Sequence, residues 1–354
     1  MEYKQTRMWQ ELCESPAFLD TLAEKNHETF RALAETLQKR RIDCIYTAAR
    51  GTSGHAMMYF RYLTESLAGI PVASGAPSVL TIYGGKLRFE NALVVACSQS
   101  GRAADALEVI QAANACGAPT VSITNDGNSP LAKAAKFRLD CAAGEEKSVA
   151  ATKTFCAQLQ LVRLLAHALA GKTAAAPLNI SAEEIARIDR ATDSVADDFA
   201  SAEDCFVLAR GVSAALAFEC ALKLQETCYI RALAYRSSDF YHGPMAMVAK
   251  GTKVILFASR HSLTEDTRAV HRADFRKCAE KMEELGADLY VFTDDGEAFE
   301  DLYAHVVRLP VGNSEEETVF RFALAAQMLA CKTSCKKGLD PDAPRALKKI
   351  TVTK

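Results

Sequence analysis

The sequence has no excess of charge of either sign and no long apolar stretch. Its 42 Lys and Arg residues nearly balance its 44 Asp and Glu residues, which leaves a net charge of −2. Because no positive field exists to hold a polyanion, we do not expect binding to nucleic acid. An uncharged apolar run near the end, Phe322 to Cys331, is about half of the roughly 20 residues that a membrane-spanning helix needs. We therefore expect a soluble protein with neither nucleic-acid nor membrane partners.

A secretory signal and a disulfide framework are also missing from the sequence. Met1 to Gln10 contains charged residues and no apolar stretch, so we expect a cytoplasmic protein. The 12 Cys residues are scattered along the chain and form no Cys-x-x-Cys pair. We expect most of them to be reduced thiols that pack as small apolar side chains.

The sequence contains one long internal repeat. Asp43 to Ser53 (DCIYTAARGTS) returns as Asp204 to Ser213 (DCFVLARGVS), one residue shorter. The apolar run Ala92 to Cys97 has a counterpart at Lys253 to Ala258, at about the same offset. A third pair of such runs lies at 117–124 and 286–293. Since 354 residues are also long for a single core, the sequence predicts two domains that share one architecture.

Each of these apolar runs is continuous rather than alternating, which is typical of parallel strands covered by helices on both faces. Segments with helical spacing separate the runs, for example Ala104 to Cys116 and Thr267 to Leu285, and a further helical stretch, Ser181 to Ala200, leads into the second half. We therefore predict an α/β protein with two doubly wound parallel-sheet domains in tandem. The expected boundaries are a helical segment at 1–42, a first domain at 43–175, a second domain at 176–335 and a tail at 336–354.

Three loops of the first half should meet at one edge of its sheet, because the carboxyl ends of parallel strands lie together and ligands bind beyond them. They are Arg50 to Gly54, Ser98 to Gly101, and Ser148 to Thr152, the last of which precedes the apolar helix Lys153 to Leu169. Each offers hydroxyls and backbone N–H groups, which is the chemistry of a phosphate cradle. The sequence has neither a Walker motif nor GxGxxG after the first strand, so these loops favour a small phosphorylated metabolite over a nucleotide.

The second half carries ionisable residues where the first half carries hydroxyls. Glu219, Lys223 and Glu226 are spaced four and three residues apart, which places them on one face of a helix. Taken alone, this segment favours an ordinary Glu-Lys ion pair exposed to solvent. His242 precedes a Gly-Pro turn, where an ordinary surface histidine is just as common.

Taken in order, these motifs resemble those of the sugar isomerase (SIS) family. The resemblance is to the tandem SIS half of the glutamine:fructose-6-phosphate amidotransferases and to the SIS-type glucosamine-6-phosphate deaminases, and it covers nearly the whole chain. It implies two flavodoxin-like domains. The matching segments are MWQELCESP (8–16), AARGTS (48–53), SQSG (98–101), SVAATKTF (148–155), ALKLQE (221–226), HGPMA (242–246) and DPDAPRALKKITV (340–352).

The resemblance implies where the phosphate and the sugar bind. One position departs from the family pattern, which often has Thr or Ser two residues after the SQSG glycine: here it is Ala103. Arg102, beside it, is a candidate replacement for the missing hydroxyl. The implied phosphate ligands are Thr52, Ser53, Ser98 and Ser100, with Gln99 alongside, and the sugar would contact Val149 and Ala150 mainly through their backbone.

The resemblance also implies the catalytic residues. Glu226 matches the base that moves a proton between C1 and C2, and Lys223 is its neighbour. His242 matches the group that opens the sugar ring, which in the family comes from the other subunit of a homodimer. Lys349 matches the C-terminal lysine that reaches the carbonyl carbon, although Lys348 beside it could take that place. No metal and no organic cofactor is implied.

The implied reaction is an aldose–ketose interconversion of a 6-phosphorylated sugar. Because the chain starts almost directly with the SIS region, we expect no glutaminase activity and predict the conversion of glucosamine 6-phosphate to fructose 6-phosphate and ammonia. Three alternatives stay open: a fructosamine-6-phosphate deglycase, a non-catalytic phosphosugar-binding regulator, and a plain ketol isomerase.

Overall fold

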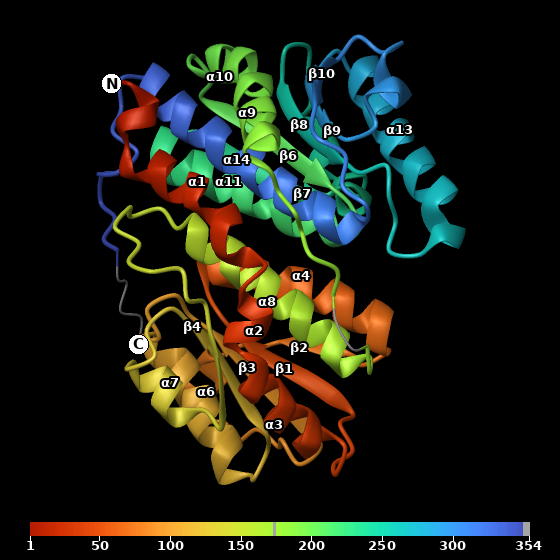
Figure 1. Ribbon diagram of the computed structural model, residues 1–354. Helices are drawn as coiled ribbons and strands as arrows, with labels where there is room; N and C mark the ends of the chain where they lie inside the picture. Colours follow the sequence, from red (N-terminus) through yellow and green to blue (C-terminus); the bar gives the residue numbers. More distant parts are fainter. Residues whose placement is uncertain (173–174, 350–354) are drawn as a thin grey trace. The chain divides into compact units, whose positions relative to one another are not determined.

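The computed structural model of the chain describes residues 1–172 and 175–349, and these form two compact units, each built on one five-stranded parallel sheet (Figure 1). The predicted fold class is therefore confirmed. Residues 173–174, near the end of the expected first domain, and 350–354, the end of the expected tail, lie outside the described residues. The first-sheet unit comprises Glu14–Glu146, Lys153–Asn179 and Lys348 with Lys349; the second-sheet unit comprises Met1–Cys13, Lys147–Thr152 and Ile180–Leu347.

The first sheet has the strand order β2-β1-β3-β4-β5, with every neighbouring pair parallel. Its central strands are buried on both faces, since every residue of β3 and β4 is buried. Apolar side chains that can be covered on two sides are the reason for the continuous runs seen in the sequence. The strands are β1 (Cys44–Ala48), β2 (Val72–Ser74), β3 (Ala92–Cys97), β4 (Thr120–Thr124) and β5 (Phe137–Asp140).

Helices cover both faces of the first sheet. On one face α4 and α8 pack against each other, with α2 and α3 on α8, and on the other face α6 packs on β3 beside α5 and α7 (Figure 1). The predicted helix Lys153 to Leu169 is confirmed as α8. The helices of this unit are α2 (Leu22–Lys25), α3 (His27–Leu37), α4 (Gly51–Ala68), α5 (Ser78–Thr81), α6 (Ala104–Ala115), α7 (Pro130–Ala134) and α8 (Lys153–Leu169).

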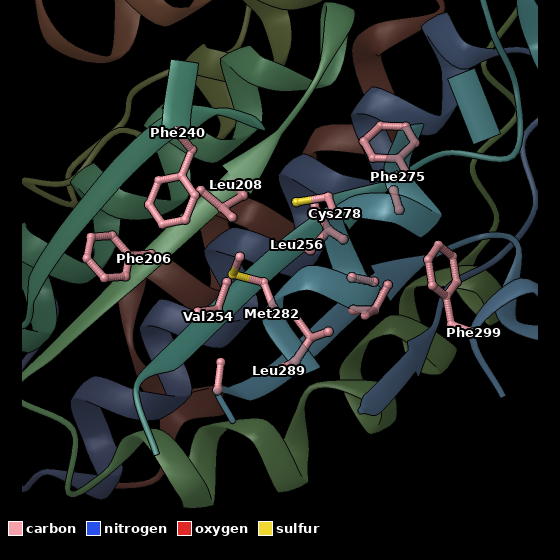
Figure 2. Packing of buried hydrophobic residues seen from close by; sticks show 14 of the residues in the cluster. Phe206, Leu208, Phe240, Val254, Leu256, Phe275, Cys278, Met282, Leu289 and Phe299 are labelled. Carbon is pink, nitrogen blue, oxygen red and sulfur yellow. The ribbon is translucent and has the colours of Figure 1, made fainter. Parts of the chain in front are cut away.

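The second sheet repeats the same connectivity, with the order β10-β9-β8-β6-β7. Helices α11 and α14 pack against each other on one face, and α13 covers the other, where Phe275, Cys278 and Met282 point at the apolar side chains of the sheet (Figure 2). The strands are β6 (Asp204–Ala209), β7 (Arg231–Arg236), β8 (Lys253–Ala258), β9 (Asp288–Thr293) and β10 (His305–Arg308). The longer helices of the unit are α9 (Ala182–Ala191), α10 (Asp193–Phe199), α11 (Ala214–Cys228), α13 (Arg268–Glu284) and α14 (Glu315–Lys336).

Several short elements and one helix complete the chain. Helix α1 (Arg7–Leu19) begins in the second-sheet unit and ends in the first-sheet unit. The expected helix Ser181 to Ala200 is divided at Thr192 into α9 and α10. The short elements are η1 (Tyr3–Gln5), η2 (Gly211–Ser213), α12 (Ser237–Phe240), η3 (Pro244–Met247), η4 (Glu265–Thr267) and η5 (Gly296–Phe299).

Helix α14 is the buried centre of the second-sheet unit, and it carries paired charges rather than a purely apolar surface. The Arg321 guanidinium donates to Glu184 at 2.9 Å, and the Lys332 ammonium lies 2.6 Å from an Asp193 carboxylate oxygen. Buried charges need such partners because their desolvation is costly. Within the described part of the chain, no helix combines the length and the apolar character required to cross a membrane.

Candidate active site

The first predicted phosphate loop is built by the end of β1 and the start of α4. Gly51 has a φ of 50°, a conformation that glycine adopts without strain. This turn places Thr52 and Ser53 in the first turn of an 18-residue helix. Free backbone N–H groups at such a helix start attract anions.

The second predicted loop, Ser98 to Gly101, is fixed by backbone hydrogen bonds. The Ser98 N–H donates to Ile123 at 3.0 Å, and the Gly101 N–H donates to Ser98 at 3.1 Å. A side chain could not be placed on Gly101, because a Cβ there would lie 2.0 Å from the Ser129 hydroxyl. The loop therefore holds the Ser100 hydroxyl at the carboxyl end of β3 in one backbone conformation.

A cavity of about 420 Å³ opens beside this second loop, entirely within the first-sheet unit. Its volume lies in the range of small-molecule sites. Its lining combines amide, hydroxyl, cationic and anionic groups, which is the mixture that a charged and polyhydroxylated ligand requires. The lining residues are Gln99, Ser100, Arg102, Asn125, Asp126, Gly144, Glu145, Glu146 and Lys349.

Lys349 reaches the cavity and is held there by a carboxylate that sequence analysis missed. The Lys349 ammonium lies 2.6 Å from Glu146 Oε2, and the Glu146 side chain is fully buried. Glu146 also accepts from the backbone N–H of Thr154 at 3.1 Å and from its hydroxyl at 2.8 Å, in the first turn of α8. Lys348 is exposed and is not one of the lining residues. The pair Glu145-Glu146, separated from SVAATKTF only by Lys147, was the available signal for this residue.

The arginine of each Arg-Gly loop, after β1 and after β6, pairs with an aspartate on the helix that follows the neighbouring strand of the sheet, α6 after β3 and α13 after β8. In the first-sheet unit Arg50 Nε lies 2.8 Å from Asp105, whose side chain is 4% exposed. In the second-sheet unit Arg210 Nη1 lies 3.2 Å from Asp274. Because both loops keep this pair, we regard the two arginines as part of the fold rather than as ligand groups.

The two Arg-Gly loops differ in the groups that surround their glycine. A Cβ on Gly51 would meet no described atom within 4 Å, whereas one on Gly211 would lie 3.4 Å from both Glu315 and His271. The Glu315 carboxyl is 2% exposed, and its burial raises its pKa to about 8. The edge of the second sheet is thus filled by the protein's own carboxyl and imidazole groups, while the equivalent place on the first sheet is open to a ligand.

The third predicted loop, Ser148 to Thr152, belongs to the second-sheet unit and is held from α1. The carboxylate of Glu11 accepts from the backbone N–H groups of Lys147, at 2.5 Å, and of Ser148, at 3.1 Å. Gln327 on α14 donates to the Thr152 carbonyl at 3.2 Å. Within this loop Ala150 is buried and Val149 is half-buried. Glu11 lies in the opening segment of the chain, and its position in the sequence gave no sign of this role.

The charged face of α11 is buried, so the exposed ion-pair interpretation of this spacing is wrong. Lys223 and Glu219 are both fully buried, and the Glu226 side chain is 22% exposed. The Lys223 ammonium lies 2.5 Å from Glu226 Oε2 and 3.4 Å from Glu219 Oε1. Burial by itself would lower the pKa of Lys223, but the two carboxylates outweigh it and raise the pKa well above its usual value. Lys223 is therefore a permanent cation that orients Glu226.

His242 lies in an exposed turn between α12 and η3. Its backbone N–H donates to the Asp239 carbonyl at 3.1 Å, and the following Gly243 has a φ of 145°.

The predicted site residues fall into two groups, one in each unit. The first-sheet unit holds Thr52, Ser53, Ser98, Gln99, Ser100 and Lys349, and the second-sheet unit holds Val149, Ala150, Lys223, Glu226 and His242.

Among residues 1–172 and 175–349, no three His, Cys, Asp or Glu side chains are grouped so that they could hold a metal ion. The arrangement is that of an α/β protein with an open, hydroxyl-bearing sheet edge in one unit and, in the other, a helix face on which Glu219 and Lys223 are buried and Glu226 is partly exposed. The chain belongs to the SIS domain family, whose model matches it twice, at residues 38–168 and 198–335.

Curated relatives of this chain are longer proteins. The glutamine–fructose-6-phosphate aminotransferase (isomerizing) of Bordetella parapertussis is 32% identical over 367 residues, which cover 98% of this chain and 58% of that protein. The chain thus spans little more than half the length of this relative. The match shows that the chain belongs to the same family. The activity of the whole aminotransferase is a property of that longer protein.

Solved structures of related folds superpose on nearly the whole chain. The C-terminal domain of glucosamine-fructose-6-phosphate aminotransferase from Francisella tularensis has a TM-score of 0.83 at 23% identity and covers 96% of this chain and 98% of that one. Glucosamine-6-phosphate deaminase from Thermotoga maritima has a TM-score of 0.72 at 22% identity and covers 98% of this chain and 100% of that one. At these identities the two structures establish the shared fold.

Proposed function

We propose that the protein is an aldose–ketose isomerase of 6-phosphorylated amino sugars, which converts glucosamine 6-phosphate and water to fructose 6-phosphate and ammonia. The observation that carries this proposal is the cavity in which Ser100 and Gln99 of the phosphate loop lie with the Lys349 ammonium. A cation in the same cavity as phosphate-binding hydroxyls can hold the carbonyl or imine end of a short phosphorylated sugar.

In this proposal the phosphate is bound at the carboxyl end of the first sheet. The hydroxyls at the ends of β1 and β3 donate to its oxygens, the helix start of α4 adds backbone N–H groups, and Gln99 lies alongside. The backbone of Val149 and Ala150 contacts the sugar, which explains why Glu11 fixes that loop through its N–H groups. The proposed hydroxyl donors are Thr52, Ser53, Ser98 and Ser100.

The proton chemistry in this proposal is assigned to the second-sheet residues. His242 opens the sugar ring, and Glu226 then removes the proton from C2, which gives an enolamine. Glu226 returns the proton to C1, so that C2 becomes a ketimine. Water adds to C2 and ammonia leaves, which yields fructose 6-phosphate. Lys349 stabilises the negative charge that develops at the carbonyl end during proton transfer.

The proposal is tested by incubating the protein with glucosamine 6-phosphate and measuring ammonia and fructose 6-phosphate. Both should form in equal amounts, and non-phosphorylated glucosamine should not react because the phosphate contacts are lost. Parallel incubations with a fructosamine 6-phosphate and with glucose 6-phosphate separate the alternatives. Turnover of only the former would identify a deglycase, turnover of only the latter a plain ketol isomerase, and binding without any turnover a regulator.

The exposure of His242 supports a homodimer in which each subunit supplies this residue to the other. A C2 interface makes such an exchange reciprocal. A His242→Ala chain mixed with a Glu226→Gln chain should then regain activity, because some hybrid sites receive both groups intact. Activity should be assayed after co-refolding, with each variant alone as the baseline. Full activity in a species that sediments as a monomer would contradict the exchange.

A further inference from the structure

Arg102 places a guanidinium group in the cavity, on the same loop as the proposed phosphate hydroxyls. It directly follows Ser98 to Gly101, and its own backbone N–H donates to the Ser100 hydroxyl at 3.3 Å. Its side chain is 52% exposed, and Nη2 lies 3.2 Å from Asp126 Oδ2. Arg102 and Lys349 are the two cations of the cavity lining. The guanidinium is therefore beside a proposed phosphate site while bound to another anion.

Asp126 is the fixed partner of this pair. Its other carboxylate oxygen accepts from the Asn128 N–H at 2.9 Å, and its own N–H donates to the Thr124 hydroxyl at 3.2 Å, directly after β4. Among the described contacts, the Arg102 guanidinium has no partner besides Asp126. Its long side chain can rotate about several bonds. If the pair separates, the guanidinium moves and the carboxylate stays.

A change of partner for the Arg102 guanidinium, from Asp126 to a phosphate, is favourable for general physical reasons. An ion pair as exposed as this one contributes little to stability, because water solvates both charges. A phosphate monoester carries nearly two negative charges and presents oxygens that match the two-pronged guanidinium. Ala103 supplies no hydroxyl at the next position of the loop. The loop therefore has no hydroxyl donor at this position, and Arg102, directly before it, is the nearest cation along the loop.

We propose that Arg102 is a ligand of the substrate's phosphoryl group and that Asp126 competes with the phosphate for it. In the structure the Arg102 guanidinium is paired with Asp126, and both residues line the cavity. When a phosphate monoester enters, Arg102 leaves Asp126 and donates to the phosphate oxygens, while the Asp126 carboxylate keeps its backbone hydrogen bond to Asn128. This inference rests on the proposed binding of a sugar phosphate in the same cavity, and it makes Asp126 a determinant of how tightly the phosphate binds.

The test is the binding of glucitol 6-phosphate, an unreactive phosphosugar, measured by isothermal titration calorimetry. Arg102→Ala should weaken binding about 10- to 100-fold, the loss expected for a charge-assisted hydrogen bond. Asp126→Asn should tighten binding several-fold, because the competing carboxylate is gone. The double variant should bind no more tightly than Arg102→Ala alone. If Asp126→Asn tightens binding equally without Arg102, the carboxylate only repels the phosphate and the proposed competition is wrong.

Arg138→Ala is the matched control for the loss of a positive charge. The Arg138 guanidinium donates to the carbonyl of Gly127, the residue after Asp126, at 3.2 Å, but it is not one of the lining residues of the cavity. Its removal should change the affinity less than twofold. An effect as large as that of Arg102→Ala would show a general loss of positive field and would overturn the assignment.

A Ser98→Ala/Ser100→Ala variant separates failure of this inference from failure of the proposed function. Loss of two hydroxyls that face a phosphate should weaken binding about 30- to 1,000-fold. If this variant binds as tightly as the wild type, the phosphate is not bound in this cavity and both proposals fail. If it binds weakly while Arg102→Ala binds normally, the phosphate site stands and the role of Arg102 is wrong. Thermal melts of every variant confirm that each is folded.

Discussion

Glu226→Gln is expected to slow exchange of the C2 proton of glucosamine 6-phosphate with solvent by about 10²–10⁴-fold, the usual loss for a missing general base. Glutamine keeps the size of the side chain but cannot accept the proton. Binding of the sugar phosphate should be retained, because the proposed phosphate ligands lie in the first-sheet unit. The measurement is loss of the C2 proton signal by NMR in deuterated water, together with calorimetry for affinity.

Glu219→Gln is the matched control for this variant. Glu219 also contacts Lys223 from the same helix, but it is fully buried, whereas Glu226 is 22% exposed and accessible to a substrate. Glu219→Gln should therefore keep most of the exchange. Lys349→Ala should lose ammonia release yet retain some exchange, and the exposed Lys348 should be replaceable by Ala with little effect. Exchange at the wild-type rate in Glu226→Gln would mean that the base is a different residue.

Lys223→Met should destabilise the second-sheet unit by about 3–5 kcal/mol, because it leaves carboxylates in a buried environment without their cation. Glu219 is fully buried and would lose its ion pair with Lys223. Urea unfolding can be followed through Trp9, the single Trp of the chain, which is 8% exposed and belongs to the second-sheet unit. The midpoint of the unfolding curve should fall clearly below that of the wild type.

A triple variant, Glu219→Gln with Lys223→Met and Glu226→Gln, should recover most of this lost stability, since no uncompensated charge is left buried. An unchanged midpoint in Lys223→Met would show that water reaches these carboxylates.

The pH dependence of the free energy of unfolding has a definite sign as well. The fold raises the pKa of Lys223 above its unfolded value of about 10.4. The contribution of Lys223 to the free energy of unfolding is therefore complete below the unfolded pKa. It is lost only as the pH rises through the higher pKa of the folded state.

The strands that sequence analysis found are those buried on both faces. The continuous apolar runs of β3 and β8 can only be covered from two sides, and this requirement is visible in the residues themselves. The edge strands β2, β5, β7 and β10 were not predicted. Each has exposed or half-exposed positions and pairs with only one neighbour, as in β5, where a single residue of four is buried. Their conformation is decided by pairing with the strand beside them.

The helix expected at Ser181 to Ala200 shows a second limit of local patterns. Helical composition is continuous there, but the Thr192 hydroxyl donates to the Ile188 carbonyl at 3.1 Å and accepts from Lys332 at 3.1 Å. Lys332 lies on α14, 140 residues further along the chain. The break between α9 and α10 thus coincides with a contact that helical periodicity does not contain.

Spacing along the chain was enough to predict that hydroxyls follow β1 and β3 and that Glu219, Lys223 and Glu226 share a helix face, because both depend on one element and its loop. The burial of this helix face could not be predicted in that way, since it results from the packing of α14 against α11. Tertiary structure also decided that Glu146 holds Lys349 across 203 residues and that Glu11 holds the loop at Ser148 across 137. Partners so distant in sequence are brought together only when the core packs, and the spacing of residues along the chain carries no record of that packing.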